Sequence, residues 1–306
     1  MEYLSDNFRR FFKNVNVGVT TEQTAAREYA AVKALLEDPN GRASALSPQC
    51  FLQGSYRQET AIHDLNDVDV VALCKLWQPG SGSGGGGWTR DQIFSTLAAP
   101  FLADHRYRNK VRYSANSMCI KLELDIKVEI LPAVFAAANS DPQTEPFRLY
   151  RPSKGEWDNG YARYHQQWLT WKNRNDITGG TFIPTIKVLK HIRTVFGIKV
   201  VSFHLESFLF RLPQETFVGA PAEYIPRILS TIAARSADDW YRAVVKTPCE
   251  DRDVFTAAEW TGADWNAFHQ LIVDLAPVAT MAQQATTQAG AVELWKIVLG
   301  KDHFPD

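Results

Sequence analysis

The sequence is poor in features that belong to an oxidising compartment or a membrane. Its 306 residues include only four cysteines, which form no CxxC pair and no zinc-binding spacing: Cys50, Cys74, Cys119 and Cys249. Nowhere do about 18 apolar residues run together, and the first residues hold no apolar stretch of signal-peptide length. The sequence therefore predicts free thiols, no membrane-spanning helix and a cytoplasmic location.

An excess of charge of either sign is also missing. The 33 basic and 34 acidic residues give a formal net charge of −1, which excludes a protein whose affinity rests on uniform positive charge. We therefore expect no strong DNA-binding surface. Apolar residues make up 45% and charged residues 22%, so a chain of this length can bury a core without disulfides, and global disorder is excluded.

Hydrophobic periodicity changes along the chain from helical to strand-like and back to helical. Helices are expected at 5–14, 21–38, 91–103, 181–196 and 200–211, and again over 222–299 with an interruption at 246–254. Strands are expected at 50–53, 67–73, 117–124 and 127–131. Pro132 is expected to close the last of these strands. The glycine-rich stretch 80–87 resembles a linker, natural or engineered, and carries no chemistry. This order predicts an α+β protein with a sheet-bearing core at 1–150 and a helical lobe at 151–306.

Four basic residues alternate within the segment 105–113: Arg106, Arg108, Lys110 and Arg112. Alternation predicts one basic face of a strand. A charged edge strand that resists aggregation is the simpler interpretation. The alternative is a surface for a macromolecular partner, such as tRNA or a protein.

Two carboxylates open the most apolar strand of the first half. Asp67 and Asp69 alternate at its start, so both project from one face. Mutual repulsion raises a pKa in such a pair unless a cation lies between the groups. Because Mg²⁺ prefers carboxylate and phosphate oxygens, the pair predicts a site for two Mg²⁺ ions, which Mn²⁺ can replace.

A Gly-Ser pair precedes these carboxylates by a short stretch. Gly54 permits close backbone approach, and Ser55 offers a hydroxyl and an N–H to phosphate oxygens. Either motif alone is common, but a Gly-Ser turn 12 residues before an Asp-x-Asp strand is much more specific. A third carboxylate completes such a site. Glu129 and Asp125 are both candidates on the run 124–132, and we favour Glu129.

Together, Gly54-Ser55, Asp67-x-Asp69 and a strand ending in Glu129-x-x-Pro132 resemble the polymerase-β-type nucleotidyltransferases. Within that class the chain is most similar to the CD-NTases of anti-phage defence, the bacterial relatives of cyclic GMP–AMP synthase and oligoadenylate synthase. The similarity continues through 182–191, 202–207 and 294–305. The third carboxylate of the family is usually Asp, so Glu129 departs from the pattern and keeps Asp125 open.

The resemblance implies a polymerase-β-like core joined to a helical lobe, with the active site in the cleft between them. It also implies the following roles. Gly54 and Ser55 would hold the donor triphosphate; Asp67, Asp69 and Glu129 would bind metal and act in catalysis; Lys187 and Lys190 would contact donor phosphates; and Ser202 would lie near the phosphates or the base.

The function implied is a Mg²⁺-dependent synthase that joins ATP or other NTPs into a cyclic di- or trinucleotide and releases pyrophosphate. A downstream effector would read this second messenger in anti-phage (CBASS) signalling, and a regulatory protein is a conceivable further partner. Two alternatives stay open. One is a nucleotidyltransferase that modifies tRNA or a protein, and the other is an inactive nucleotide-binding module, against which the intact Asp-x-Asp argues.

Overall fold

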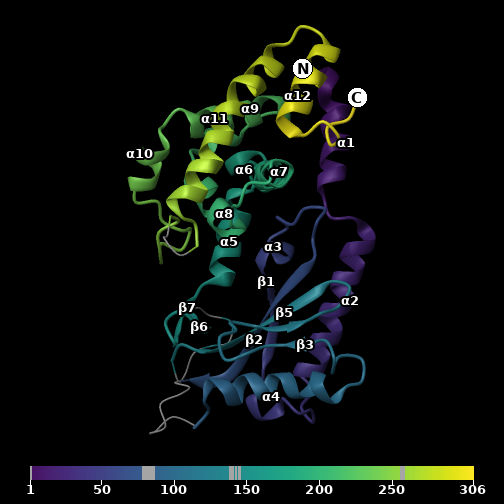
Figure 1. The fold of residues 1–306 in the computed structure, drawn as a ribbon, viewed down its shortest axis with the longest axis vertical. Coiled ribbons are helices and arrows are strands. Elements are labelled where there is room, and N and C mark those ends of the chain that lie inside the picture. Colours follow the sequence, from purple (N-terminus) through teal and green to yellow (C-terminus); the bar gives the residue numbers. More distant parts are fainter. Residues whose placement is uncertain (1, 78–86, 138–140, 142, 144–145, 256–258) are drawn as a thin grey trace. The chain divides into compact units, whose positions relative to one another are not determined.

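The computed structural model describes residues 2–77, 87–137, 141, 143, 146–255 and 259–306. Residues 80–86 of the glycine-rich stretch therefore lie outside the described part. The chain divides into a helical unit, made of Met1–Val17, Gln58–His63 and His165–Asp306, and a sheet unit, made of Gly18–Arg57 and Asp64–Tyr164 (Figure 1).

The sheet unit is built around one mixed sheet, with seven strands among the described residues. The strands are β1 (Gln49–Gln53), β2 (Asp67–Trp77), β3 (Val111–Arg112), β4 (Ile120–Leu122), β5 (Lys127–Phe135), β6 (Phe147–Arg151) and β7 (Glu156–Gly160). Their order is β1-β2-β5-β4-β3, with the β6–β7 hairpin on the far end of β5. The β2–β5 pair is parallel and the other pairs are antiparallel.

The α-helices that lie wholly within the described part of this unit are α2 (Val19–Leu36), α3 (Gly54–Arg57) and α4 (Arg90–Ala103). Helices α2 and α4 contact each other and the two central strands (Figure 1). Thr89 begins α4 with a capping box, in which its side chain and that of Gln92 each accept the other's backbone N–H. The interiors of β2 and β5 are buried apolar runs, as expected for strands at the centre of a sheet.

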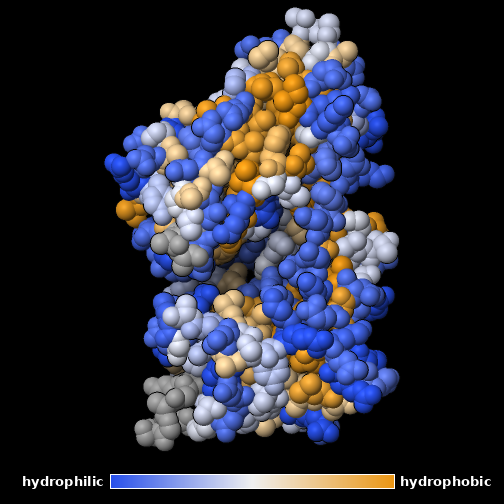
Figure 2. Space-filling view, in the orientation of Figure 1, coloured by the Kyte–Doolittle hydropathy of each residue, from blue (hydrophilic) through white to orange (hydrophobic). Residues whose placement is uncertain are grey.

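The helical unit contains α1 (Ser5–Val15), most of α5 (Ala162–Lys172), α6 (Asn175–Thr178), α7 (Phe182–Val195), α8 (Ser202–Phe210), α9 (Pro221–Ala233), α10 (Ala237–Arg242), α11 (Gly262–Gln284) and α12 (Gln288–Leu299). Its core is rich in aromatic side chains, with Trp260, Trp265 and Trp295 fully buried. Figure 2 shows an apolar area over α11 and α12, helices on which Met281 and Ile297 are exposed. None of the described helices has both the length and the apolar character needed to cross a membrane.

The predicted α+β class is confirmed, but the structural units differ from a division at residue 150. Helix α1 packs in the helical unit because its apolar side chains meet the C-terminal residues. The ring of Phe8 lies 5.0 Å from that of Trp295 and 5.1 Å from that of Phe304. The sheet unit extends to Tyr164, because the β6–β7 hairpin pairs with β5.

Two expectations about strands are wrong. Residues 105–110 form turns rather than a strand, so Arg112 is the one member of the basic set that lies in a strand. Asp104 causes this, because its carboxylate accepts the backbone N–H of Arg106 at 2.9 Å and also binds its guanidinium. Nor does Pro132 close its strand. It falls between the segments of β5 that pair with β4 and with β6, where a missing N–H breaks no bond to either.

Candidate active site

The predicted carboxylates lie on two strands that pair in parallel. Asp69 on β2 lies opposite Glu129 on β5, and Asp67 precedes Asp69 by two residues on the same face. Adjacent strands are about 4.8 Å apart, so the three side chains share one patch of the sheet. The register thus brings Asp67, Asp69 and Glu129 together.

Gly54 directly follows β1 and lies against Asp69. The last residue of β1, Gln53, pairs with Asp69. Gly54 has a φ of +71°, and a Cβ added there would lie 2.0 Å from Oδ2 of Asp69. Backbone conformation and contact therefore both require glycine. Ser55 follows in the short helix α3, half-buried, which places the Gly-Ser pair beside the carboxylates.

The carboxylates have more negative charge than their surroundings compensate. Burial, more than any other cause, raises the pKa of Asp69 to about 7, and the neighbouring charges of Asp67 and Glu129 add to the effect. Burial and Glu129 also raise the pKa of Asp67. Such repulsion is what a bound cation would relieve, and carboxylate oxygens are the ligands that hard divalent ions prefer. The donor set therefore fits a divalent metal.

The side chains as they stand do not form a closed metal cage. In the described part of the chain, no three His, Cys, Asp or Glu side chains gather as a metal site would require. Glu129 is engaged elsewhere: its Oε1 lies 2.6 Å from Nζ of Lys121. A metal ligated by all three carboxylates would therefore need Glu129 to exchange its partner.

The two candidates for the third carboxylate occupy different surroundings. Asp125 is exposed in the bend between β4 and β5. Glu129 lies within β5, beside Asp69 and with its side chain 23% exposed. The bend at 124–126 breaks the alternation that could have placed both on one face. Position alone thus favours Glu129.

Three further predicted residues belong to the helical unit. Lys187 on α7 donates a hydrogen bond to Oδ1 of Asn16 at 2.8 Å. Ser202 is the first residue of α8, and its hydroxyl accepts a hydrogen bond from Arg193 at 3.0 Å. Both side chains are half-buried.

Lys190, the third of them, lies deep inside the helical unit. Its ammonium is 2.6 Å from Oε1 of Glu206 and 3.0 Å from Oγ1 of Thr60, and the side chains of Lys190 and Glu206 are each 2% exposed. Burial would raise the pKa of Glu206, but Lys190 and His165 outweigh it and lower that pKa to about 2. The geometry therefore gives Lys190 an internal ion pair and ties the segment 58–63 to α7.

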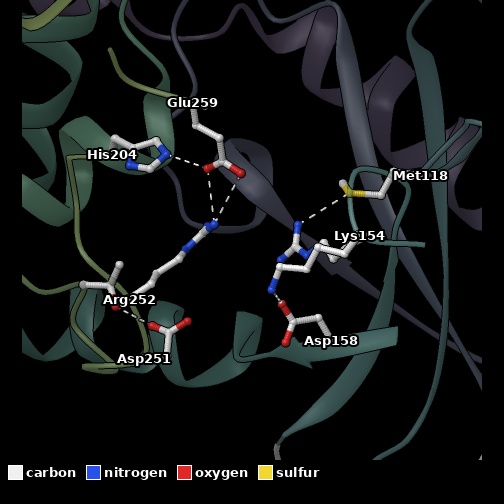
Figure 3. A network of polar contacts seen from close by, with 9 residues as sticks. Met118, Lys154, Asp158, His204, Asp251, Arg252 and Glu259 are labelled. Atoms are coloured by element: carbon white, nitrogen blue, oxygen red, sulfur yellow. Dashed lines mark hydrogen bonds and ion pairs between the residues drawn. The ribbon is translucent and has the colours of Figure 1, made fainter. Parts of the chain in front are cut away.

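A second polar network in the helical unit is nearer the surface. Figure 3 shows His204 and Arg252 meeting the same carboxylate, that of Glu259, at 2.7 Å and 3.2 Å. The guanidinium of Arg252 also lies over the ring of Phe203. Lys154 and Asp158 of the sheet unit, drawn in the same figure, form an exposed ion pair of 2.7 Å. The pairs of Arg252 with Glu259 and of Lys154 with Asp158 match opposite charges, so neither calls for a metal.

Sequence reasoning assigned no role to two residues that the structure makes prominent. Lys121 lies on an expected strand, and its alternation with Cys119 could have placed it beside the carboxylates had the register been known. Glu206 carried no signal, because its partners Thr60 and Lys190 are 146 and 16 residues away along the chain.

A mixed sheet with two carboxylates on a central strand, beside the Gly-Ser pair, is the arrangement that the resemblance to the polymerase-β-type nucleotidyltransferases implied. Residues 1–173 match the model of the Second Messenger Oligonucleotide or Dinucleotide Synthetase domain. The chain belongs to this family, which confirms the resemblance to the bacterial CD-NTases.

Individual relatives agree with this assignment. A cyclic UMP-AMP synthase from Rhodothermus marinus (strain SG0.5JP17-172) is 26% identical over 225 residues, covering 66% of this chain and 75% of that protein. The structure of CdnC from E. coli MS115-1 with ATP superposes with a TM-score of 0.73 at 16% identity, over 99% of both chains. The same CdnC in a complex with HORMA-deltaN gives a TM-score of 0.72 at 16% identity, over 99% and 98%. The two structures share the fold of this chain.

Proposed function

We propose that this chain joins NTPs into a cyclic di- or trinucleotide second messenger and releases pyrophosphate, with Mg²⁺ or Mn²⁺ as the required metal. The observation that carries the proposal is the carboxylate patch of Asp67, Asp69 and Glu129 against Gly54. The raised pKa of Asp69, about 7, supports a site built to receive positive charge.

Each residue of the patch has a distinct part in this proposal. Asp67 and Asp69 would hold the metal, with Glu129 as third ligand, and Gly54 and Ser55 would bind the phosphates of the donor nucleotide. The bound metal would supply electrostatic stabilisation of the charge on the transferred phosphoryl group and activate the attacking hydroxyl. Gly54 lets the backbone approach the donor phosphates without displacing Asp69, because Oδ2 of Asp69 leaves no space for a side chain at position 54.

The residues of the helical unit would complete donor binding. Lys187 and Ser202 are half-buried and carry polar groups able to bind phosphate oxygens. Lys190 was expected to do the same, but with its side chain 2% exposed its contribution would be to hold the segment 58–63, which leads from Ser55 to Asp67.

The biological setting is part of the same proposal. The enzyme would use ATP or other NTPs in the cytoplasm, in line with the CdnC structure that was solved with ATP, and a downstream effector would respond to its product in anti-phage defence. The E. coli relative that was solved with a HORMA protein suggests that a regulatory protein partner is worth testing. Modification of tRNA or protein is the alternative; the basic residues Arg106, Arg108 and Lys110 are exposed, but they lie in turns and not on one strand face.

The test is an incubation of the purified protein with labelled NTPs, singly and in pairs, with Mg²⁺ or Mn²⁺. After phosphatase treatment, resistant products resolved by chromatography and mass spectrometry support cyclisation. Label that appears only on added tRNA or protein contradicts it. Absence of transfer with every acceptor, metal and candidate regulator favours a binding module.

A further inference from the structure

Lys121 is the cation that lies beside the carboxylate patch. It stands directly opposite Glu129 in the β4–β5 pair, so the two side chains share a face of the sheet. Its Nζ is 2.6 Å from Oε1 of Glu129, while Oε2 lies 3.5 Å from Sγ of Cys119. Both oxygens of Glu129 therefore already have a partner within the sheet.

The strand registers place Lys121 at a boundary between charges of opposite sign. A single lateral row crosses the sheet through Arg112, Lys121, Glu129, Asp69 and Gln53. The two positive residues of the row lie on the β3–β4 edge, and the two negative residues lie on the central strands. Lys121 also lowers the pKa of Asp67 and of Asp69, so its charge is felt across the patch.

We propose that Lys121 is a built-in counter-ion that competes with the divalent metal for Glu129. The proposal rests on the proposed function, since it assigns Glu129 to the metal site. Without metal, Lys121 neutralises Glu129 and keeps the carboxylates compatible with the fold. When metal binds, Glu129 exchanges the ammonium for the metal. This exchange holds down the affinity for free metal, so that the patch fills when a nucleotide brings its own metal.

The exposure of the pair makes such an exchange feasible. The side chain of Lys121 is 48% exposed and that of Glu129 is 23% exposed. An ion pair at this level of exposure is held weakly, so a divalent ion can displace it. The buried pair of Lys190 and Glu206, each 2% exposed, has no such freedom. Lys121 is thus a positioning residue that acts through Glu129.

The experiment measures binding of Mn²⁺ alone to the nucleotide-free protein, by the loss of the free Mn²⁺ signal in electron paramagnetic resonance. Lys121→Gln is expected to bind Mn²⁺ about three- to fivefold more tightly than the unmodified protein, because Glu129 no longer has to release an exposed ion pair before it meets the metal. Its thermal midpoint without metal is expected to fall and to recover when Mn²⁺ is added.

Two matched variants separate competition from general electrostatics. Lys121→Arg keeps the charge and should bind Mn²⁺ like the unmodified protein. Lys127→Gln removes a positive charge that lies opposite Asp67 and lowers the pKa of that carboxyl, but it is not the ammonium paired with Glu129, so its gain in Mn²⁺ affinity should be clearly smaller than that of Lys121→Gln. If Lys121→Gln does not fold, the comparison moves to the Glu129→Gln background, where Lys121 has no Glu129 carboxylate to hold: adding Lys121→Gln there should leave the Mn²⁺ affinity unchanged, and a gain would overturn the exchange.

Unchanged or weaker Mn²⁺ binding by folded Lys121→Gln overturns the proposal, as does an equal gain in Lys127→Gln. These outcomes differ from a failure of the proposed function. In that case the unmodified protein would neither bind Mn²⁺ nor form nucleotide products. If only the Lys121 proposal fails, the unmodified protein still binds Mn²⁺ and forms nucleotide products, and only the effect of the Lys121 substitution is missing.

Discussion

The molecule contains two groups of charged side chains that are handled in opposite ways. In the sheet unit, Asp67, Asp69 and Glu129 face one another with Lys121 paired to Glu129, and the pKa of Asp69 rises to about 7. In the helical unit, Lys190 and Glu206 match each other inside the core, and the pKa of Glu206 falls to about 2. The first arrangement opposes folding without a cation, and the second is satisfied by the fold itself.

This difference separates a site from a structural contact. A cluster whose charges are unbalanced is retained at a cost in stability, which points to a ligand that supplies the missing charge. A cluster whose charges and hydrogen bonds are matched needs no ligand, although removing one partner leaves the other buried and unpaired. Substitutions in the two groups should therefore affect different properties: activity in the sheet unit and stability in the helical unit.

The largest effect is expected from Asp69→Asn. Nucleotide transfer should fall at least about a thousandfold, because several kcal/mol of charge stabilisation depend on the metal and about 1.4 kcal/mol corresponds to a factor of ten. The thermal midpoint of the metal-free protein should stay the same or rise, since a neutral amide removes repulsion. Product chromatography and thermal melting measure the two properties. Full activity, or a loss of activity accompanied by unfolding, would sink the assignment.

Glu206→Gln should give the largest loss of stability. It leaves the ammonium of Lys190 buried without its counter-charge, which costs about 3–5 kcal/mol. Urea unfolding followed by tryptophan fluorescence reports on the helical unit, because Trp260, Trp265 and Trp295 are buried in its core. The matched control is Asp238→Asn, which breaks an exposed pair with Arg242 in the same unit and should cost no more than about 1 kcal/mol. Equal losses would contradict the contrast between the two pairs.

Glu206→Gln should also change how the stability of the protein responds to acid. Because the pKa of Glu206 lies at about 2 in the folded protein, below its ordinary value of 4.5, the folded state holds the charged form more strongly. The stability from this group is present above pH 4.5 and is lost as the pH falls towards 2. Unfolding measured across this range should show a steeper decline in the unmodified protein than in Glu206→Gln. Parallel curves would contradict the assignment.

A smaller effect is expected from Gly54→Ala. The left-handed backbone costs about 1–3 kcal/mol for a residue with a side chain, and the added Cβ also displaces Asp69. Gly155→Ala is the matched control, because Gly155 has a φ of +67° but nothing within 4 Å of an added Cβ. Thermal melting should show a loss in both variants, whereas product formation should fall in Gly54→Ala alone. Similar activities would argue that Gly54 matters only for its backbone.

Local patterns predicted most of what lies close together along the chain. The helices, the central strands and the pair of Asp67 and Asp69 follow from periodicity and alternation. The errors arose where a tertiary or local polar contact overrides the pattern. Asp104 turns the chain at Arg106 and abolishes the basic strand, and the gap between β4 and β6 lets β5 run through Pro132. The ion pair of Lys190 could not be predicted, because its partners come from segments that only folding brings together.

The smallest effect is expected from Asp125→Asn, and it decides which carboxylate is the third. Asp125 is exposed in a bend, so a neutral amide there should leave nucleotide transfer within about twofold and stability within about 0.5 kcal/mol. Glu129→Gln makes the same chemical change within β5, beside Asp69. It should lower transfer by at least about a hundredfold, although the loss of its pair with Lys121 costs little stability. Initial rates at saturating Mn²⁺ measure both. The reverse order of effects would move the third ligand to Asp125, and with it remove the reason for Lys121 to compete with metal.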